Sequence, residues 1–158
     1  MDLLTYETFG EQSVELANKL IAELNKTKSV SISAPEIGIN YKVFAMRSYP
    51  GEPVFVAFNP KIVYHSDEVA TVEETCYSYP NLKVKITRPY KIRARFQEPY
   101  GITTTKAFEG GLARLFQHEM CHMEGKVFWD DANFLHKNRA IKQWKQISRR
   151  LDNQTNAA

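Results

Sequence analysis

Cysteine is scarce in this chain, which has only Cys76 and Cys121 among 158 residues. A disulfide between them is possible in principle, but nothing else suggests an exported protein, so we expect both to be reduced thiols in a compartment like the cytoplasm. Long apolar runs are also missing, and no membrane-spanning segment is therefore expected. The first residues (MDLL) lack a basic segment followed by an apolar one, so no secretory signal is predicted.

A large excess of charge of one sign is absent as well, because the net charge is only +3. So mild a charge does not by itself imply a nucleic-acid partner, and no DNA partner is expected. Apolar residues at 43% and charged residues at 25% are typical of an ordinary globular protein. We find no repeat, linker or low-complexity stretch. The sequence thus predicts one catalytic domain over residues 1–158, with its core at about 12–151 and a polar, frayed tail at 152–158.

The spacing of apolar residues predicts three helices. The first runs over residues 13–25 with Ser13 as N-cap, the second over 110–123 with Gly125 ending it, and the third over about 133–151. Short β-like runs separated by proline and glycine turn signals lie between the first two helices, at residues 42–46, 54–58, 62–64, 82–86, 90–96 and 103–108. The predicted class is α+β, with the second helix central and packed between mostly antiparallel strands.

Residues 118–122 (HEMCH) are the most informative segment, and they lie on the central helix. His118 and His122 are four residues apart, so both side chains can reach one metal ion from one face. Glu119 lies near that face, where a carboxylate can take a proton from an activated water. Two ligands are too few, and Cys76 is the leading candidate for the third. On the pentapeptide alone the histidines could instead be structural, and Cys76 a small buried residue.

Three segments in a fixed order resemble motifs of the peptide deformylase family. They are residues 33–38 (SAPEIG), 73–80 (EETCYSYP) and 117–122 (QHEMCH), set against the family patterns GxGxAAxQ, EGCLS and QHExDH. The first predicted helix and residues 58–60 (FNP) and 125–128 (GKVF) also fit, so the resemblance covers about residues 12–150. It implies a metal-dependent hydrolase that removes the N-terminal formyl group from formyl-methionine of new polypeptides and releases formate.

The resemblance also implies a ligand set. Cys76, His118 and His122 would hold one divalent ion per chain, with a water in the fourth position. One thiolate and two imidazoles suit Fe(II), Zn(II), Ni(II) or Co(II), and Fe(II) is the expected native metal. Glu119 would be the general base. The donors to the oxyanion would be the backbone N–H of Tyr77 and the side chain of Glu36.

Two residues in these motifs depart from the family patterns in ways that affect the chemistry. Glu36 stands where the family has Gln, and an ionised carboxylate cannot donate a hydrogen bond. Our hypothesis is that burial near Glu119 keeps Glu36 protonated, so that it can still donate. Cys121 replaces an Asp within the histidine motif, and its position predicts a packed neighbour of the site and not a further ligand.

Serines at positions 29, 31 and 33 replace small glycine and alanine residues of the first motif. Size is nearly kept, but freedom to adopt positive φ is lost, so this segment is expected to follow a somewhat different path. Glu74 is interpreted as a group that orients a neighbouring loop or ligand. The competing interpretation is a solvated acid beside Glu73.

Alternative functions stay open at this point. One is a catalytically silent relative that binds formylated peptide or ribosome, and another is a zincin-type endopeptidase that uses the same histidine motif. The third predicted helix carries Lys142, Lys145 and Arg149 on one side. This basic face either contacts ribosomal RNA or is simply solvated. We expect a monomer that works in the cytoplasm of a bacterial or phage-infected cell.

Overall fold

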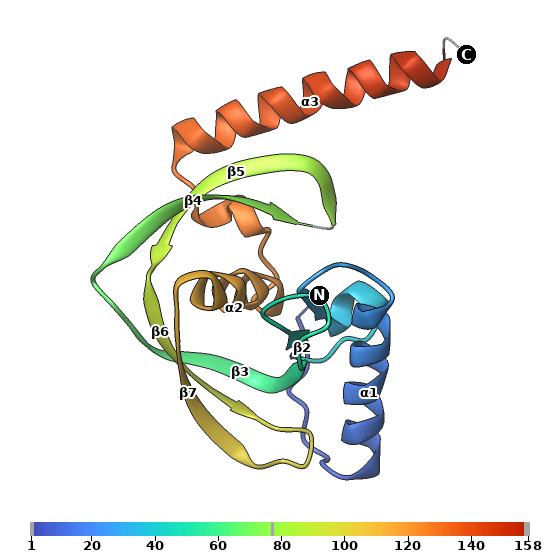
Figure 1. Ribbon diagram of the computed structural model, residues 1–158, viewed down its shortest axis with the longest axis vertical. Helices are drawn as coiled ribbons and strands as arrows, with labels where there is room; N and C mark the ends of the chain where they lie inside the picture. Colours follow the sequence, from blue (N-terminus) through green and yellow to red (C-terminus); the bar gives the residue numbers. More distant parts are fainter. Residues whose placement is uncertain (1, 77, 157–158) are drawn as a thin grey trace. The chain divides into compact units, whose positions relative to one another are not determined.

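The computed structural model describes residues 2–76 and 78–156 (Figure 1). The chain divides into two compact units. The first unit consists of Met1–Val69 and Pro89–Val127, and the second consists of Ala70–Arg88 and Phe128–Ala158. Three α-helices and two sheets occur in the described ranges, and this confirms the predicted α+β class. None of the helices described there is long and apolar enough to cross a bilayer. That residues 1–158 act as a single domain stays a prediction.

The first unit is built on a five-stranded antiparallel sheet with the strand order β1-β2-β3-β6-β7. The bounds are β1 Ser31–Ser33, β2 Val43–Met46, β3 Phe55–His65, β6 Lys91–Gln97 and β7 Thr103–Glu109. In strand β6 the apolar residues are buried and the alternating basic residues are exposed. The sheet therefore has one face available for packing against a helix.

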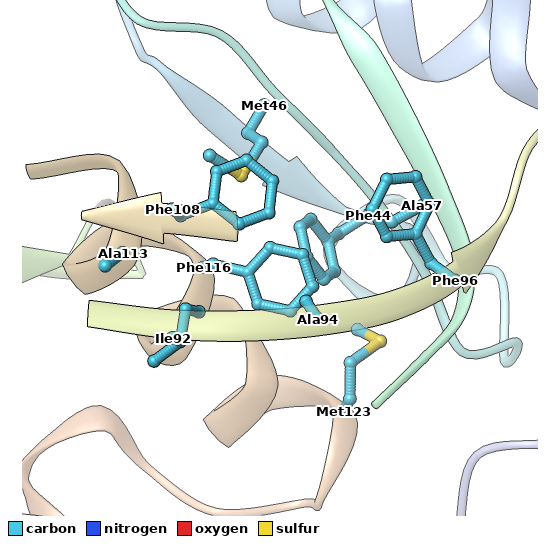
Figure 2. Close-up of a cluster of buried hydrophobic side chains, with 10 residues drawn as sticks. All are labelled: Phe44, Met46, Ala57, Ile92, Ala94, Phe96, Phe108, Ala113, Phe116 and Met123. Carbon is cyan, nitrogen blue, oxygen red and sulfur yellow. The ribbon is translucent and has the colours of Figure 1, made fainter. Parts of the chain in front are cut away.

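Helix α2 (Gly110–Met123) packs against that face. Phe116 is fully buried at the centre of the contact, with its ring centroid 4.9 Å from that of Phe44 and 5.3 Å from that of Phe108. Figure 2 shows these rings together with their buried neighbours Met46, Ala57, Ile92, Ala94, Phe96, Ala113 and Met123. Buried aromatic rings contribute much of a core's apolar area, so this cluster fixes α2 on the sheet.

Helix α1 (Glu11–Asn25) buries Ala17, Leu20 and Leu24 in a second core. Val43 and Ala45 of β2 belong to this core, whereas Phe44 and Met46 belong to the α2 core. Successive residues of a strand point to opposite faces, so all four residues of β2 are buried. Strand β2 thus links the two helices of the first unit (Figure 1).

The end of α2 is fixed as its sequence predicts. Gly125 adopts φ 72°, a left-handed conformation that glycine accepts without strain. Its N–H donates to the carbonyl of His122 at 3.2 Å, and the N–H of Lys126 donates to the carbonyl of Cys121 at 2.9 Å. This pair of hydrogen bonds is the Schellman motif, which places His122 in the last turn of the helix.

Three predicted boundaries were wrong. Helix α1 begins at Glu11, and Ser13 is not its N-cap but lies inside the first turn, where its Oγ accepts a hydrogen bond from the N–H of Gly10. The break predicted between residues 54–58 and 62–64 lies within β3, which runs through it with a shift of register. The tail expected to fray from residue 152 is helical as far as Asn156.

The second unit contains a two-stranded sheet, β4 (Val69–Cys76) and β5 (Tyr79–Pro89), together with the short helix η2 (Phe128–Asp131) and helix α3 (Phe134–Asn156). Strand β4 was not predicted, because most of its residues are exposed and give no strong apolar signal. Buried Leu82, Val84 and Ile86 of β5 meet Phe128 and Ala140. Trp144 donates from Nε1 to the carbonyl of Pro80 at 2.8 Å, so α3 is attached to β5.

A buried ion pair joins the two strands of the second unit. Arg88 donates from Nε to Glu74 Oε2 at 2.6 Å and from Nη2 to Glu74 Oε1 at 3.0 Å. The two side chains are only 4% and 6% exposed, and Arg88 Nη1 also lies 3.2 Å from Asp131 Oδ2. Glu74 is therefore not a solvated acid, and its role is to hold β4 on β5 close to Cys76.

Replacing Glu74 by alanine should destabilise the protein by about 3–5 kcal/mol, because it leaves the buried guanidinium of Arg88 without its main counter-ion. Urea unfolding followed by circular dichroism measures the loss. The matched control is Glu23→Ala, which breaks the exposed Lys26–Glu23 pair of 2.9 Å and should cost less than about 1 kcal/mol. Equal losses in the two variants would contradict the assignment.

Candidate active site

The two histidines of α2 lie together on one face of the helix. The ring centroids of His118 and His122 are 5.4 Å apart, and the ring planes are inclined by 59°. His118 is 7% exposed, and the side chain of His122 is 15% exposed. Imidazole is a common ligand of transition metals, and i,i+4 spacing on a helix aims two such rings at one ion. The predicted pair is therefore brought together.

Glu119 lies beside the histidines and is almost completely buried, with 2% of the residue exposed. Its Oε1 accepts a hydrogen bond of 2.7 Å from Ser31 Oγ, on strand β1. Its Oε2 has no hydrogen-bond partner among the described residues. Leaving a buried polar atom unsatisfied costs about 1–3 kcal/mol, so such an atom in a native fold points to a functional use.

The surroundings of Glu119 act on its pKa in both directions. Burial raises the pKa of this carboxyl and is the largest effect. Positive charge on His122 and His118 opposes the rise, the neighbouring carboxylate of Glu36 adds to it, and the hydrogen bond from Ser31 opposes it. A carboxyl whose pKa is raised is a stronger base once it has ionised, which is the property that a general base requires.

Glu36 faces the same histidine pair from the short helix η1 (Ala34–Ile37). Its Oε1 lies 3.5 Å from His122 Nε2, and its side chain is 19% exposed. Glu36, Glu119 and His122 each offer one atom that can bind a metal, and the three atoms lie within 4.8 Å of one another. The first unit therefore gathers two carboxyl groups and two imidazoles around one point, where they can bind a cation or exchange a proton.

Two other predicted site residues belong to a different part of the chain. Cys76 is the last residue of β4 in the second unit, where it is buried as a thiol next to Leu82, Val84 and Ile86. Tyr77 lies outside the described residues. Cys121 is buried on α2 and is also a thiol.

Sequence reasoning missed the contribution of Arg47. This residue follows β2 and is only 3% exposed. Its guanidinium donates to the carbonyls of Leu24, Thr27 and Ser29 and to Asn25 Oδ1, at 2.7–3.2 Å. It therefore holds the segment between α1 and β1 in place. The only signal in the sequence was an arginine directly after an apolar run.

Sequence reasoning also missed the contact of Ser31, because a serine in place of glycine indicates only a small side chain. Ser31 and Ser33 lie in strand β1, and neither they nor Ser29 adopt positive φ. The loss of glycine therefore causes no backbone strain here. Because the hydrogen bond to Glu119 spans 88 residues of sequence, no local pattern could have indicated it.

Comparison with known proteins agrees with the resemblance. A family described as polypeptide deformylase matches residues 3–138. The peptide deformylase of Synechocystis sp. is 32% identical over 119 residues, which are 73% of this chain and 64% of that relative. The chloroplastic/mitochondrial peptide deformylase 1B of Arabidopsis thaliana is 32% identical over 127 residues, which are 78% of this chain and 46% of that relative. The matches thus span less than two thirds of these relatives' own lengths.

Solved structures share the fold. The structure of Arabidopsis thaliana peptide deformylase 1B matches with a TM-score of 0.85 at 24% identity, over 99% of this chain and 88% of that one. A peptide deformylase from Legionella pneumophila matches with a TM-score of 0.82 at 26% identity, over 96% and 90%. With the family matched over residues 3–138, this chain belongs to the polypeptide deformylase family.

Proposed function

We propose that this protein removes the N-terminal formyl group from formyl-methionine of newly made polypeptides and releases formate. The observation that carries the proposal is the environment of Glu119, which is buried beside two histidines. One of its carboxyl oxygens accepts a hydrogen bond from Ser31, and the other has no hydrogen-bond partner among the described residues. A buried carboxylate placed in this way can act as a general base. The names of the curated relatives support the same reaction.

The proposed ligands of one divalent ion are Cys76, His118 and His122. The family match over residues 3–138 includes all three side chains, and a thiolate with two imidazoles suits Fe(II), Zn(II), Ni(II) or Co(II). Fe(II) is the proposed native metal. When bound, such an ion acidifies a water and polarises the formyl carbonyl.

Glu119 performs the proton transfers in the proposed mechanism. Its unpartnered Oε2 takes a proton from the attacking water, and a carbon–oxygen bond to the formyl carbon forms. Glu119 then gives this proton to the α-amino nitrogen as the carbon–nitrogen bond breaks. The products are formate and a free N-terminus. The negative charge that develops on the formyl oxygen requires hydrogen-bond donors, for which we propose the backbone N–H of Tyr77 and the carboxyl of Glu36.

Glu36 can donate only if it carries a proton. Its closeness to Glu119 supports this state, because two neighbouring carboxyl groups resist ionising together. The hydroxyl of Ser31 favours the charged form of Glu119, since it donates to Oε1. In the proposed mechanism Glu36 carries the proton and Glu119 is the base.

We propose that the enzyme is a monomer, that it works in the cytoplasm of a bacterial or phage-infected cell, and that formylated nascent peptides are its substrate. Lys142, Lys145 and Arg149 on α3 are exposed, as both a ribosomal RNA contact and a solvated face require. The ribosome contact stays a prediction, because exposure does not distinguish the two.

Iron-loaded protein kept free of oxygen should release formate from formyl-Met-Ala-Ser. Glu119→Ala should lower kcat by about 10²–10⁴-fold and leave the metal content unchanged, because it removes only the base. Cys76→Ser should abolish metal binding, as measured by elemental analysis after gel filtration. Full metal retention by Cys76→Ser with cleavage of unformylated peptides would indicate the zincin-type peptidase. Absence of formate release from loaded protein would indicate the silent relative.

Glu36→Gln tests the proposed proton on Glu36. A glutamine amide donates the same hydrogen bond, so kcat/KM should change by less than about tenfold, whereas Glu36→Ala should lower it by about 10²–10³-fold. The control is Glu124→Gln on the exposed side chain after α2. A large gain in rate for Glu36→Gln would show that the native carboxyl is a handicap and would contradict the proposal.

A further inference from the structure

The hydrogen bond between Ser31 and Glu119 depends on a serine side chain that the family motif does not have. Ser31 Oγ lies 2.7 Å from Glu119 Oε1, a length typical of a hydroxyl donating to a carboxylate. The motif GxGxAAxQ has glycine at this position, so a side-chain donor is an addition in this chain. It meets the one buried carboxyl that the proposed reaction uses as a base.

The hydrogen bond makes the two oxygens of Glu119 unequal. Oε1 is held by Ser31, whereas Oε2 is buried without a hydrogen-bond partner among the described residues. A glutamate side chain has several rotatable bonds, and an anchored oxygen restricts the rotation that would otherwise exchange the two positions. The anchored carboxylate therefore presents the same oxygen, Oε2, to a reacting proton each time.

Ser31 is itself held firmly enough to act as an anchor. Strand β1 pairs with β2, with Ser31 opposite Met46. The N–H of Arg47 donates to the carbonyl of Val30 at 2.8 Å, and the guanidinium of Arg47 donates to the carbonyl of Ser29 at 2.7 Å. The backbone on the N-terminal side of Ser31 is thus tied to the end of β2, which is buried on both faces.

We propose that Ser31 is a positioning residue for Glu119, and that its hydroxyl fixes the carboxylate so that Oε2 is the oxygen that accepts the proton. This inference rests on the proposed function for its catalytic consequence. The hydrogen bond itself does not depend on that function. The role belongs to the hydroxyl and not to the size of the residue, so it is lost in alanine and in glycine alike and is retained in threonine.

The matched control is Ser33, two residues along the same strand. Side chains two apart on a strand share a face, and Ser33 Oγ is buried with no hydrogen-bond partner among the described residues. Ser33→Ala therefore removes a hydroxyl from the same strand and the same face without breaking a hydrogen bond. It reports any general effect of such a change on folding or on metal loading.

The experiment compares Ser31→Ala, Ser31→Gly, Ser31→Thr and Ser33→Ala as full-length, metal-loaded proteins. Ser31→Ala and Ser31→Gly should lower kcat about tenfold or more, with KM and metal content within about twofold of wild type, because the loss is confined to the reaction step. Ser31→Thr should recover kcat to within about threefold of wild type. Ser33→Ala should match wild type in every readout.

A second readout is independent of activity. In zinc-loaded protein labelled with ¹³C at the glutamate δ-carbon, the Glu119 signal is assigned from its disappearance in Glu119→Gln. Ser31→Ala should move this signal, whereas Ser33→Ala should leave it in place. An unmoved signal, or a kcat within twofold of wild type in Ser31→Ala, would overturn the role of Ser31. If wild-type protein releases no formate, the proposed function fails, and the signal alone then decides whether Ser31 holds Glu119.

Discussion

The burial of one carboxyl group, that of Glu119, is the constraint on which the site depends. An unpaired charge in a protein interior is costly, and a group in that position gives up its charge unless its neighbours support it. Here burial raises the pKa, while two histidines and the Ser31 hydroxyl favour the ionised form. These opposing influences act on one group, so the proposed role of Glu119 as a base depends on how the first unit packs around it.

That packing depends on strand β2, which is buried on both faces. Its alternate residues belong to the α1 core and to the α2 core. The same four residues therefore help to position both the helix that carries the histidines and the segment before β1. Arg47 extends this effect, because it follows β2 and binds the carbonyls between α1 and β1. Ser31 and Glu119 are 88 residues apart in sequence, but both lie on elements that pack on this strand.

The parts of the fold that the sequence predicted are those with local causes. The bounds of α2, its end at Gly125 and the shared face of His118 and His122 all follow from spacing within one helix. The parts it missed depend on distant contacts. Asn59 lies inside β3 with φ 51° because its side chain accepts from the N–H of Tyr6 and donates to Gln97 Oε1, contacts that no local turn rule contains. The pairing of the exposed strand β4 with β5 likewise could not be predicted from the spacing of apolar residues.

The two departures in the first motif have opposite effects on the same group. Glu36, in place of glutamine, adds a carboxylate that raises the pKa of Glu119, and Ser31, in place of glycine, adds a hydroxyl whose hydrogen bond lowers it. The second carboxyl alone would hold the proton on the base and remove a donor from the oxyanion. The hydroxyl alone would favour the ionised base more strongly than a glycine does. In the proposed reaction the proton rests on Glu36, and of these two side chains it is the Ser31 hydroxyl that favours the ionised Glu119 which a base requires.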